Sequence, residues 1–397
     1  MEIGYNKMNI TPDHSVAMAG YSRKSKSTGV IDPIEINTII IKIGKKSLVI
    51  SMLDAIIIED CVIQPVKRII NEKYSLADQN VIVGCIHTHS APAYFKPFFE
   101  EVDVEQELQQ ELIEQFVASI DGAFASLQEA SLKISQVEIE ELYGNRNKMN
   151  GYSDKNLTRL DFSNGQTKIC TVLALSCHPT ILNGANTELS ADIFGAIRQK
   201  YQAIYGNPCM VINGAAGDVS TRFYRQKEGV EEIARFTREL FSQFSNMKDM
   251  PLRIDDIKSA QVIREYEFYG QDEFTRSEIK RIESLIDPKF ETALLQVLKL
   301  KQEKSPMILK LTSNIIFLGD LLLVSLPGDI TSPLGKKIRD AFKDKFVLII
   351  GYTENYSNYF VSEQDYGKYF ETYISRLKKG NADDFIEQVI QEAKKLK

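Results

Sequence analysis

Two histidines, His87 and His89, follow a stretch that is typical of a buried β-strand, residues 80–84 with the sequence Asn-Val-Ile-Val-Gly. They are half of the four histidines among the 397 residues. Because residues i and i+2 of an extended chain face the same side, both imidazoles can point into one pocket. One ring could bind a metal ion while the other moves a proton, although two ordinary loop histidines would give the same pattern.

Further polar residues stand at the ends of other apolar stretches: His178, the pair Asp218 and Ser220, Asp329, and a group of tyrosines after Ile350. Open α/β sheets bind ligands in the crevice outside the carboxyl ends of their strands. These clusters are far apart in the sequence, but they could converge on one site with the two histidines.

Most of these clusters also have a structural interpretation. His178 alone could be a buried histidine with satisfied hydrogen bonds, and Asp329 could cap a helix that begins at Thr331. Residues 214–217, Gly-Ala-Ala-Gly, could cradle a phosphate. However, they lack the Lys-Ser/Thr of a P-loop and the spacing of a dinucleotide-binding motif.

Ser220 and two cysteines offer further nucleophiles or ligands. A Ser-His-Asp triad with Ser220 is conceivable, but residues 217–220, Gly-Asp-Val-Ser, do not match the Gly-x-Ser-x-Gly pattern. Cys85 and Cys177 lie next to the histidines and could be ligands. Cysteines inside apolar strands are more often packed thiols, so both alternatives stay open.

The hydrophobic pattern predicts an α/β fold in which a mixed β-sheet core is flanked by helices. Helices are expected at residues 59–71, 106–127, 191–205, 229–244, 277–303, 334–342 and 383–397. Hairpins are expected at residues 36–53, 160–177 and 309–326, and further strands at 81–84, 132–142, 208–212, 254–266 and 345–350. No internal repeat, low-complexity tract or linker is visible, so we expect residues 1–397 to form a single large domain.

The composition limits the classes of protein to consider. With 43% hydrophobic and 26% charged residues, the chain suits a soluble globular protein with a large core. A net charge of -6 argues against a nucleic-acid-binding protein, and no apolar run approaches the roughly 20 residues of a transmembrane helix. Five scattered cysteines and an N-terminus without an apolar signal region predict a cytoplasmic location.

Several motifs occur in the same order as in a known family. They are His-Thr-His-Ser-Ala-Pro at residues 87–92, His-Pro-Thr at 178–180, Asn-Gly-Ala-Ala-Gly-Asp-Val-Ser at 213–220 and Gly-Tyr at 351–352. The opening, with Asn-Ile-Thr-Pro at residues 9–12, Gly-Tyr at 20–21 and Asp-Pro at 32–33, is also similar. The chain thus resembles the catalytic domain of the neutral/alkaline, non-lysosomal ceramidases over most of its length.

This resemblance implies a zinc enzyme that cleaves the amide bond of N-acylsphingosines. The zinc ligands carried over by motif are His87, His178, Asp329 and Tyr359. The catalytic residues carried over are His89, which would act on protons, Ser220, whose role as nucleophile or structural residue is open, Tyr369 and Lys148. The substrate-binding residues carried over are Gly20, Arg146 and Tyr366.

The chain departs from the family pattern at several positions. The family's glutamate ligand is Asp329 here, one methylene shorter, so the backbone must come closer or the ligand is weaker. The family's catalytic arginine aligns with Lys148, although Arg146 could substitute for it. Thr221 and Arg222 replace the family's Pro-Asn. The chain stops where the family's C-terminal β-sandwich would begin, so we expect a catalytic domain only.

We therefore expect a zinc-dependent hydrolase that acts on an N-acyl amide, either a ceramide-like lipid or a smaller compound. One alternative is a non-catalytic ligand-binding relative that keeps the metal site. Another is a metal-free serine hydrolase that uses Ser220. The sequence does not determine the oligomeric state.

Overall fold

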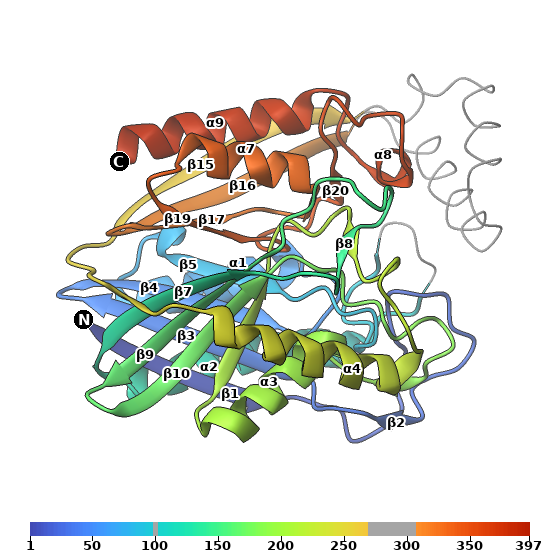
Figure 1. Ribbon diagram of the computed structural model, residues 1–397, viewed down its shortest axis with the longest axis horizontal. Helices are drawn as coiled ribbons and strands as arrows, with labels where there is room; N and C mark the ends of the chain where they lie inside the picture. Colours follow the sequence, from blue (N-terminus) through green and yellow to red (C-terminus); the bar gives the residue numbers. More distant parts are fainter. Residues whose placement is uncertain (98–101, 269–306) are drawn as a thin grey trace.

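Three large β-sheets, each with helices packed on it, form most of the described part of the protein in the computed structural model (Figure 1). The structure describes residues 1–97, 102–268 and 307–397. The helix expected at residues 277–303 lies outside the described residues. The α/β class predicted from the sequence, a mixed sheet core flanked by helices, is confirmed.

The first sheet forms around the hairpin expected at residues 36–53. Its elements are β1 (Glu2–Asn9), β3 (Glu35–Ile43), β4 (Lys46–Leu53), α1 (Asp60–Tyr74), the 3-10 helix η1 (Asp78–Asn80), β5 (Val81–Cys85), α2 (Gln106–Ala125) and β6 (Gln128–Glu129). The strand order is β5-β4-β3-β1-β6, and β4 runs parallel to β5 after the crossover through α1. Helices α1 and α2 pack together on this sheet.

The second sheet contains the hairpin expected at residues 160–177. Its elements are β7 (Ser131–Glu138), β9 (Asn156–Asn164), β10 (Thr167–Leu175), α3 (Asp192–Tyr205), β12 (Cys209–Asn213), α4 (Gly229–Ser242), the 3-10 helix η2 (Gln243–Asn246) and β14 (Met250–Leu252). The order is β12-β10-β9-β7-β14, with β10 parallel to β12. Helix α3 packs against β12 and α4.

The third sheet contains the hairpin expected at residues 309–326. Its elements are β15 (Lys258–Phe268), β16 (Met307–Leu318), β17 (Leu321–Ser325), α7 (Ser332–Ala341), β19 (Phe346–Ile350) and α9 (Asn381–Leu396). The order is β15-β16-β17-β19, with β17 parallel to β19. Helices α7 and α9 cover this sheet (Figure 1).

The three sheets repeat one topology. In each, a first strand pairs antiparallel with a hairpin, the second strand of the hairpin leads through a helix to a parallel fourth strand, and another helix follows. The fourth strands are β5, β12 and β19. The sequence analysis found no internal repeat, because the repetition lies in the order of elements and not in their residues.

One apolar core joins the three sheets. It contains Ile50 from β4, Val172 from β10 and Leu323 from β17, all at most 4% exposed. Separate apolar clusters lie beneath α1 and α2, beneath α3 and α4, and beneath α7 and α9. Since burial of each such side chain stabilises the fold by about 1.5–3 kcal/mol, the shared core fixes the strand ends relative to one another.

The fourth strands of the three sheets meet at their carboxyl ends. The Asn213 side-chain amide donates to the Ile86 carbonyl over 3.2 Å, and the Gly351 N–H donates to the Asn213 carbonyl over 2.9 Å. The Cys85 N–H donates to the Tyr352 carbonyl over 3.0 Å. The loops that follow β5, β12 and β19 are therefore held close to one another.

Short elements complete these loops. Three two-stranded pairs are β2 (Gly29–Val30) with β11 (Glu188–Leu189), β8 (Gly144–Asn145) with β13 (Val219–Ser220), and β18 (Asp329–Ile330) with β20 (Tyr359–Phe360). Helix α8 (Phe370–Ile374) follows β20.

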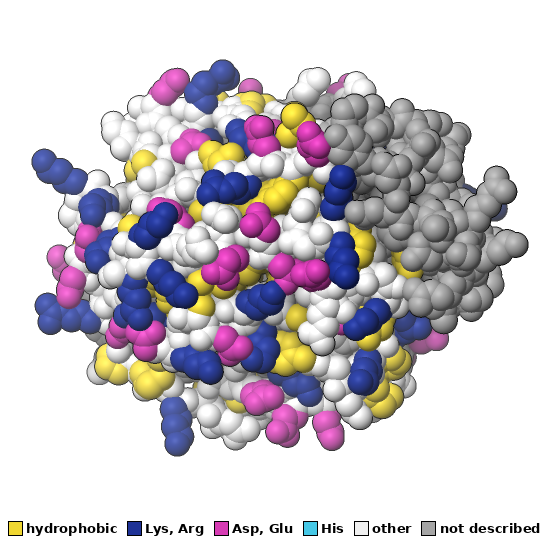
Figure 2. Space-filling model, turned by 90° about the horizontal axis from the view of Figure 1, so that it is seen from above, with side chains coloured by type: hydrophobic (Ala, Val, Ile, Leu, Met, Phe, Trp, Pro, Cys, Tyr) yellow, Lys and Arg dark blue, Asp and Glu magenta, His cyan; other side chains and the backbone are white. Residues whose placement is uncertain are grey.

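On the face seen from above in Figure 2, which includes α7 and α9, positively and negatively charged side chains are intermixed. Lys337 pairs with Asp383 of α9, and Lys397 pairs with Asp344. The expected helix at residues 383–397 is thus confirmed as a surface helix, α9. Among the three described ranges, no helix is long and apolar enough to cross a membrane.

Candidate metal centre

His87 lies directly beyond β5 with its side chain buried. Its φ of +70° is in the left-handed region, which non-glycine residues rarely adopt and which recurs at functional sites. Nδ1 lies 2.6 Å from the Ile56 carbonyl oxygen. Because a carbonyl can only accept, Nδ1 carries the proton and Nε2 presents a lone pair to the protein interior.

His178, beyond β10, has the same arrangement. Its Nδ1 donates to the Ala216 carbonyl over 2.6 Å, so Nε2 again carries a lone pair. The His87 and His178 rings meet edge to face with centroids 4.9 Å apart. Hydrogen bonds of this kind from the distal ring nitrogen are typical of metal-binding histidines.

Asp329 faces both Nε2 atoms and is fully buried. Its Oδ1 lies 3.5 Å from His87 Nε2 and 3.3 Å from His178 Nε2, and no described residue donates a hydrogen bond to it. The hydroxyl of Tyr356 donates to Oδ2. Three buried lone-pair atoms thus face one another without a proton between them, an arrangement that fits a divalent cation.

His89 is the third histidine of the group. Its Nδ1 donates to the Gly20 carbonyl over 3.0 Å, and its Nε2 lies 3.3 Å from His87 Nε2. The possible ligand atoms of His87, His89 and His178 all lie within 4.8 Å of one another. His89 is 9% exposed and the other two are 1% exposed, so His89 is the ring most open to water.

Gly20 contributes to this site through its small size. Its φ is +107°, and a Cβ there would lie 2.7 Å from both Cα and Cβ of His89. Only glycine lets this backbone approach His89 so closely that its carbonyl accepts a hydrogen bond from Nδ1. In this structure the expected substrate-binding residue Gly20 therefore supports His89 directly.

Tyr359 joins the centre because β20 pairs in parallel with β18, in a register that places it opposite Asp329. Its hydroxyl oxygen lies 3.4 Å from His178 Nε2, and the two rings are parallel. The four side chains carried over as zinc ligands, although they come from different sheets and loops, are gathered around one point. Asp329 can reach this point because Gly217 has no side chain. A Cβ at Gly217 would lie only 2.7 Å from the Asp329 carbonyl oxygen.

Burial controls the ionisation of these groups. It lowers the pKa of His87 to about 3 and lowers the pKa values of His89 and His178 well below the usual range. It raises the pKa of Asp329 to about 6, although the Tyr356 hydroxyl acts in the opposite direction. The histidines are therefore neutral at pH 7, the state in which imidazole binds metals.

Arg146, and not Lys148, reaches the centre. The Arg146 Nη2 group donates to the Tyr359 hydroxyl oxygen over 3.0 Å, and Nε donates to Glu371 Oε1 over 2.8 Å. Lys148 is exposed, and its backbone N–H bonds to the Asn145 side chain. Of the two residues that could match the family arginine, Arg146 therefore lies at the centre and Lys148 points to solvent, because the turn after β8 directs only Arg146 inward.

Ser220 lies in β13, where its Oγ accepts the Arg222 N–H over 3.2 Å. Among the described residues, no histidine forms a hydrogen bond with its hydroxyl. The neighbouring Asp218 is the better-connected member of the motif. It accepts hydrogen bonds from the Ser332 N–H and hydroxyl and from the Asn145 amide, and burial raises its pKa to about 7.

The position of Asp218 also tests the alternative that Asp329 caps helix α7. Helix α7 begins at Ser332 after Thr331, and Asp218 Oδ1 accepts the Ser332 N–H over 2.6 Å. Asp329 therefore does not cap this helix, and the expectation that it could is wrong. Its carboxylate is directed to the histidines.

The two other expected tyrosines lie further along the chain. Tyr366 donates its hydroxyl to the Leu377 carbonyl over 3.3 Å and packs beside Tyr359. Tyr369 is half-buried immediately before α8, and in the described part of the chain none of the histidines bonds to it. The cysteines pack in the strand ends, where the Cys85 and Cys177 thiols face backbone carbonyls.

Sequence reasoning missed Glu371, and it gave Tyr352 no role of its own beyond its place in the Gly-Tyr motif. Glu371 is 2% exposed and accepts a hydrogen bond from the Arg146 Nε–H group. Tyr352 stacks on His87 with ring centroids 4.3 Å apart. A buried acidic residue near a tyrosine-rich segment was the available signal, but burial is not readable from one sequence.

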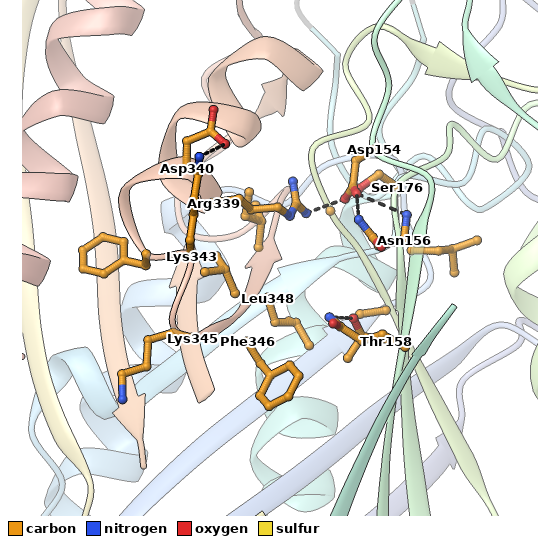
Figure 3. A pocket seen from close by; sticks show the side chains of 17 residues that line it. Asp154, Asn156, Thr158, Ser176, Arg339, Asp340, Lys343, Lys345, Phe346 and Leu348 are labelled. Atoms are coloured by element: carbon orange, nitrogen blue, oxygen red, sulfur yellow. Dashed lines mark hydrogen bonds and ion pairs between the residues drawn. The ribbon is translucent and has the colours of Figure 1, made fainter. Parts of the chain in front are cut away.

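A cavity of about 270 Å³ lies between the second and third sheets (Figure 3). Its walls include Ser176, two residues before His178, and Gly214, two residues before Ala216. Asp154 accepts the Ser176 hydroxyl over 3.1 Å and pairs with Arg339 of α7. These contacts join the two sheets behind the His178 segment, and none of the histidines lines the cavity.

Comparisons with known proteins show a family and two solved structures of similar fold. The family model for the N-terminal part of neutral/alkaline non-lysosomal ceramidases matches residues 1–204. The crystal structure of neutral ceramidase from Pseudomonas aeruginosa matches with a TM-score of 0.79 and 18% identity, over 99% of this chain and 74% of that one. A ceramidase complexed with C2 matches with a TM-score of 0.77 and 16% identity, over the same shares. A search of curated protein sequences gives no match.

Proposed function

The chain belongs to the neutral/alkaline non-lysosomal ceramidase family, and from this premise we propose that it is a zinc-dependent hydrolase of an N-acyl amide bond. The observation that carries the proposal is that His87 Nε2 and His178 Nε2 both lie within 3.5 Å of the carboxylate oxygen Asp329 Oδ1. All three are acceptors. Such a set is unfavourable when buried alone and favourable around a cation.

The donor types support zinc as the metal. Two imidazole nitrogens, one carboxylate oxygen from Asp329 and the phenol oxygen of Tyr359 make a set of nitrogen and oxygen ligands that suits zinc. When bound, zinc would supply Lewis acidity, which lowers the pKa of water to about 7 and polarises a carbonyl group.

His89 is the residue proposed to move protons. Its Nδ1 is fixed by the Gly20 carbonyl, so its Nε2 is free to accept a proton from water and return it to the leaving nitrogen. Burial lowers the pKa of His89 well below its usual range, so the ring is neutral at pH 7 and its Nε2 carries a lone pair before the reaction. The higher exposure of His89 supports this assignment over a third ligand histidine.

Arg146 is proposed to stabilise the negative charge that develops on the amide oxygen. The guanidinium has five N–H groups, and its described bonds to Tyr359 and Glu371 use two of them. One well-placed donor at such a position is worth roughly 3 kcal/mol. Arg146 replaces Lys148 in this role, and Tyr369 remains a second candidate donor.

The substrate class follows from the family and from the structural relatives. We propose an N-acyl lipid of the ceramide type, because one relative is a ceramidase complexed with C2. A smaller N-acyl compound is the second candidate within this class.

Two other functions compete with this proposal. A serine hydrolase would need a base beside Ser220, whereas its Oγ accepts a backbone N–H from Arg222. A non-catalytic ligand-binding relative would keep the three-atom acceptor set. The substitution of aspartate for glutamate at Asp329 is the feature that favours this second alternative.

One experiment separates the three functions. The purified protein is stripped of metal, assayed on short- and long-chain N-acylsphingosines and N-acyl amino acids, and reassayed after zinc is added. Zinc should restore hydrolysis in the wild type, and His89→Ala should bind zinc without turnover. Chelator-resistant activity that Ser220→Ala abolishes would favour the serine hydrolase, and zinc binding without hydrolysis of any substrate would favour the binding protein.

A further inference from the structure

The Arg146 side chain is held between two other side chains. Its Nη2 group donates to the Tyr359 hydroxyl oxygen over 3.0 Å, and its Nε donates to Glu371 Oε1 over 2.8 Å. The Arg146 side chain is 18% exposed and that of Glu371 is 2% exposed. The ion pair is therefore largely shielded from water and from screening by salt.

Glu371 accepts hydrogen bonds from two neighbouring residues of the turn after β8, Arg146 and Asn147. Its second oxygen, Oε2, accepts the Asn147 side-chain amide over 2.9 Å. The Arg146 backbone N–H is bound separately, to the Asp218 carbonyl over 2.8 Å. The backbone of this turn is thus anchored to β13, while the direction of the guanidinium depends on Glu371.

The negative charge of Glu371 balances the positive charge of Arg146 beside the candidate metal centre. The Arg146 guanidinium donates to the Tyr359 hydroxyl oxygen, which itself lies 3.4 Å from His178 Nε2. A guanidinium beside a site for a divalent cation would repel that cation unless its own charge is balanced. Glu371 supplies the balancing charge, 2.8 Å from the Arg146 Nε atom.

We propose that Glu371 is a positioning residue of the reaction site, which acts by holding the Arg146 guanidinium against the Tyr359 oxygen. The inference rests on the proposed amide hydrolysis. An arginine has many side-chain rotamers, and its planar fork is effective only when its orientation is fixed. Through Arg146, Glu371 fixes both the donor offered to the substrate and the position of the tyrosine at the metal centre.

A double-mutant cycle tests this chain of action. Glu371→Gln keeps the shape and removes the charge, and we expect kcat to fall about 10- to 100-fold with KM changed less than about threefold. Arg146→Gln should lower kcat at least as much. In the Arg146→Gln background, Glu371→Gln should have no further effect, because the residue it positions is already gone. Multiplicative effects of the two substitutions would overturn the proposal.

The dissociation constant for zinc, measured by competition with a chelator, gives a readout that does not need turnover. Glu371→Gln should weaken zinc binding about tenfold, and this effect should also vanish in the Arg146→Gln background. If the wild type hydrolyses no amide, the proposed function fails, while this second cycle still decides the role of Glu371. Unchanged zinc affinity and unchanged kcat in Glu371→Gln would contradict that role.

Two further variants keep the test decisive. Glu363→Gln removes an exposed carboxylate from the same segment, 4.0 Å from Lys379, and should leave both constants unchanged. If Glu371→Gln does not fold, as judged by circular dichroism, Asn147→Ala replaces it. This variant removes one of the two hydrogen bonds that fix Glu371 and should lower kcat about threefold. A wild-type kcat in Asn147→Ala would then overturn the proposal.

Discussion

Two buried aspartates each follow the third strand of their sheet, but they have different partners. Asp54 follows β4 in the first sheet, and Asp329 follows β17 in the third. Both are fully buried, and burial raises the pKa of each to about 6. In burial and in ionisation the two carboxyl groups are therefore alike.

They differ in the cation that each one meets. Asp54 accepts two hydrogen bonds from the Arg198 guanidinium of α3, one of them from Nη1 over 2.8 Å, and a third from the Glu35 N–H. The Tyr356 hydroxyl donates to one oxygen of the Asp329 carboxylate, and the neutral imidazoles of His87 and His178 face the other oxygen. A structural carboxylate carries its own counter-ion in the chain, whereas Asp329 is arranged for a cation from solution.

Loss of the Asp329 charge is expected to have the largest effect. Asp329→Asn should weaken zinc binding by more than about 100-fold, because a ligand is lost and not merely a supporting contact. The metal-free variant should be as stable as the wild type or more stable, since a buried charge has been removed. Chelator competition and urea unfolding measure the two quantities. The matched variant Asp54→Asn should lose stability and keep its zinc affinity, and the reverse pattern would contradict the comparison.

Loss of the Arg198 charge should act on stability alone. Arg198→Met leaves Asp54 buried without its counter-ion, and we expect the free energy of unfolding to fall by about 3–5 kcal/mol. Urea titration with circular dichroism checks this value. Zinc stoichiometry at low temperature should stay that of the wild type, so a variant that loses zinc while still folded would blur the distinction between the two aspartates.

Tyr356 should have a smaller effect at the metal centre. Tyr356→Phe removes the hydroxyl that donates to Asp329 Oδ2, so that the carboxylate can rotate away from the histidines. Zinc affinity should fall about tenfold, as is usual for a residue that orients a ligand. Tyr366→Phe is the matched control, because its hydroxyl bonds to the Leu377 carbonyl, and its zinc affinity should not change.

The pH dependence of metal-free stability should show the smallest effect. The pKa of His87 is lowered to about 3, so acidification from pH 7 to 5 protonates this histidine in the unfolded chain first and lowers the stability by about 2 kcal/mol. The lowered pKa values of His89 and His178 add to this loss. The pKa of Asp329 is raised to about 6, so its stabilising contribution is present at low pH and is lost as the pH rises through 6. Urea unfolding of Asp329→Asn should therefore give a steeper loss between pH 7 and 5, by about 1 kcal/mol. Equal slopes would mean that Asp329 does not titrate as described.

Much of the framework could be predicted from the sequence. The β-branched runs at Val81–Cys85 and Phe346–Ile350 and the hairpin turn at Gly44 give strands in the expected places. The polar residues that follow them, His87 and the tyrosines, are gathered because strand ends are gathered. Local pattern and the general behaviour of α/β sheets were sufficient for these parts.

Other parts depend on contacts between distant segments and could not be predicted. The choice between Arg146 and Lys148 depends on the turn after β8, which is set by pairing with β13 and by the bond from Arg146 to the Asp218 carbonyl. Glu371 becomes functional only because α8 lies against that turn. The threefold topology was hidden because each sheet buries different residues in the shared core.

The most direct test of the account is anomalous X-ray diffraction at the zinc absorption edge from a crystal of the zinc-loaded protein. We predict one strong peak among His87 Nε2, His178 Nε2, Asp329 Oδ1 and the Tyr359 hydroxyl. A well-ordered crystal with these four atoms in place and the peak elsewhere, or with no peak, would contradict the account.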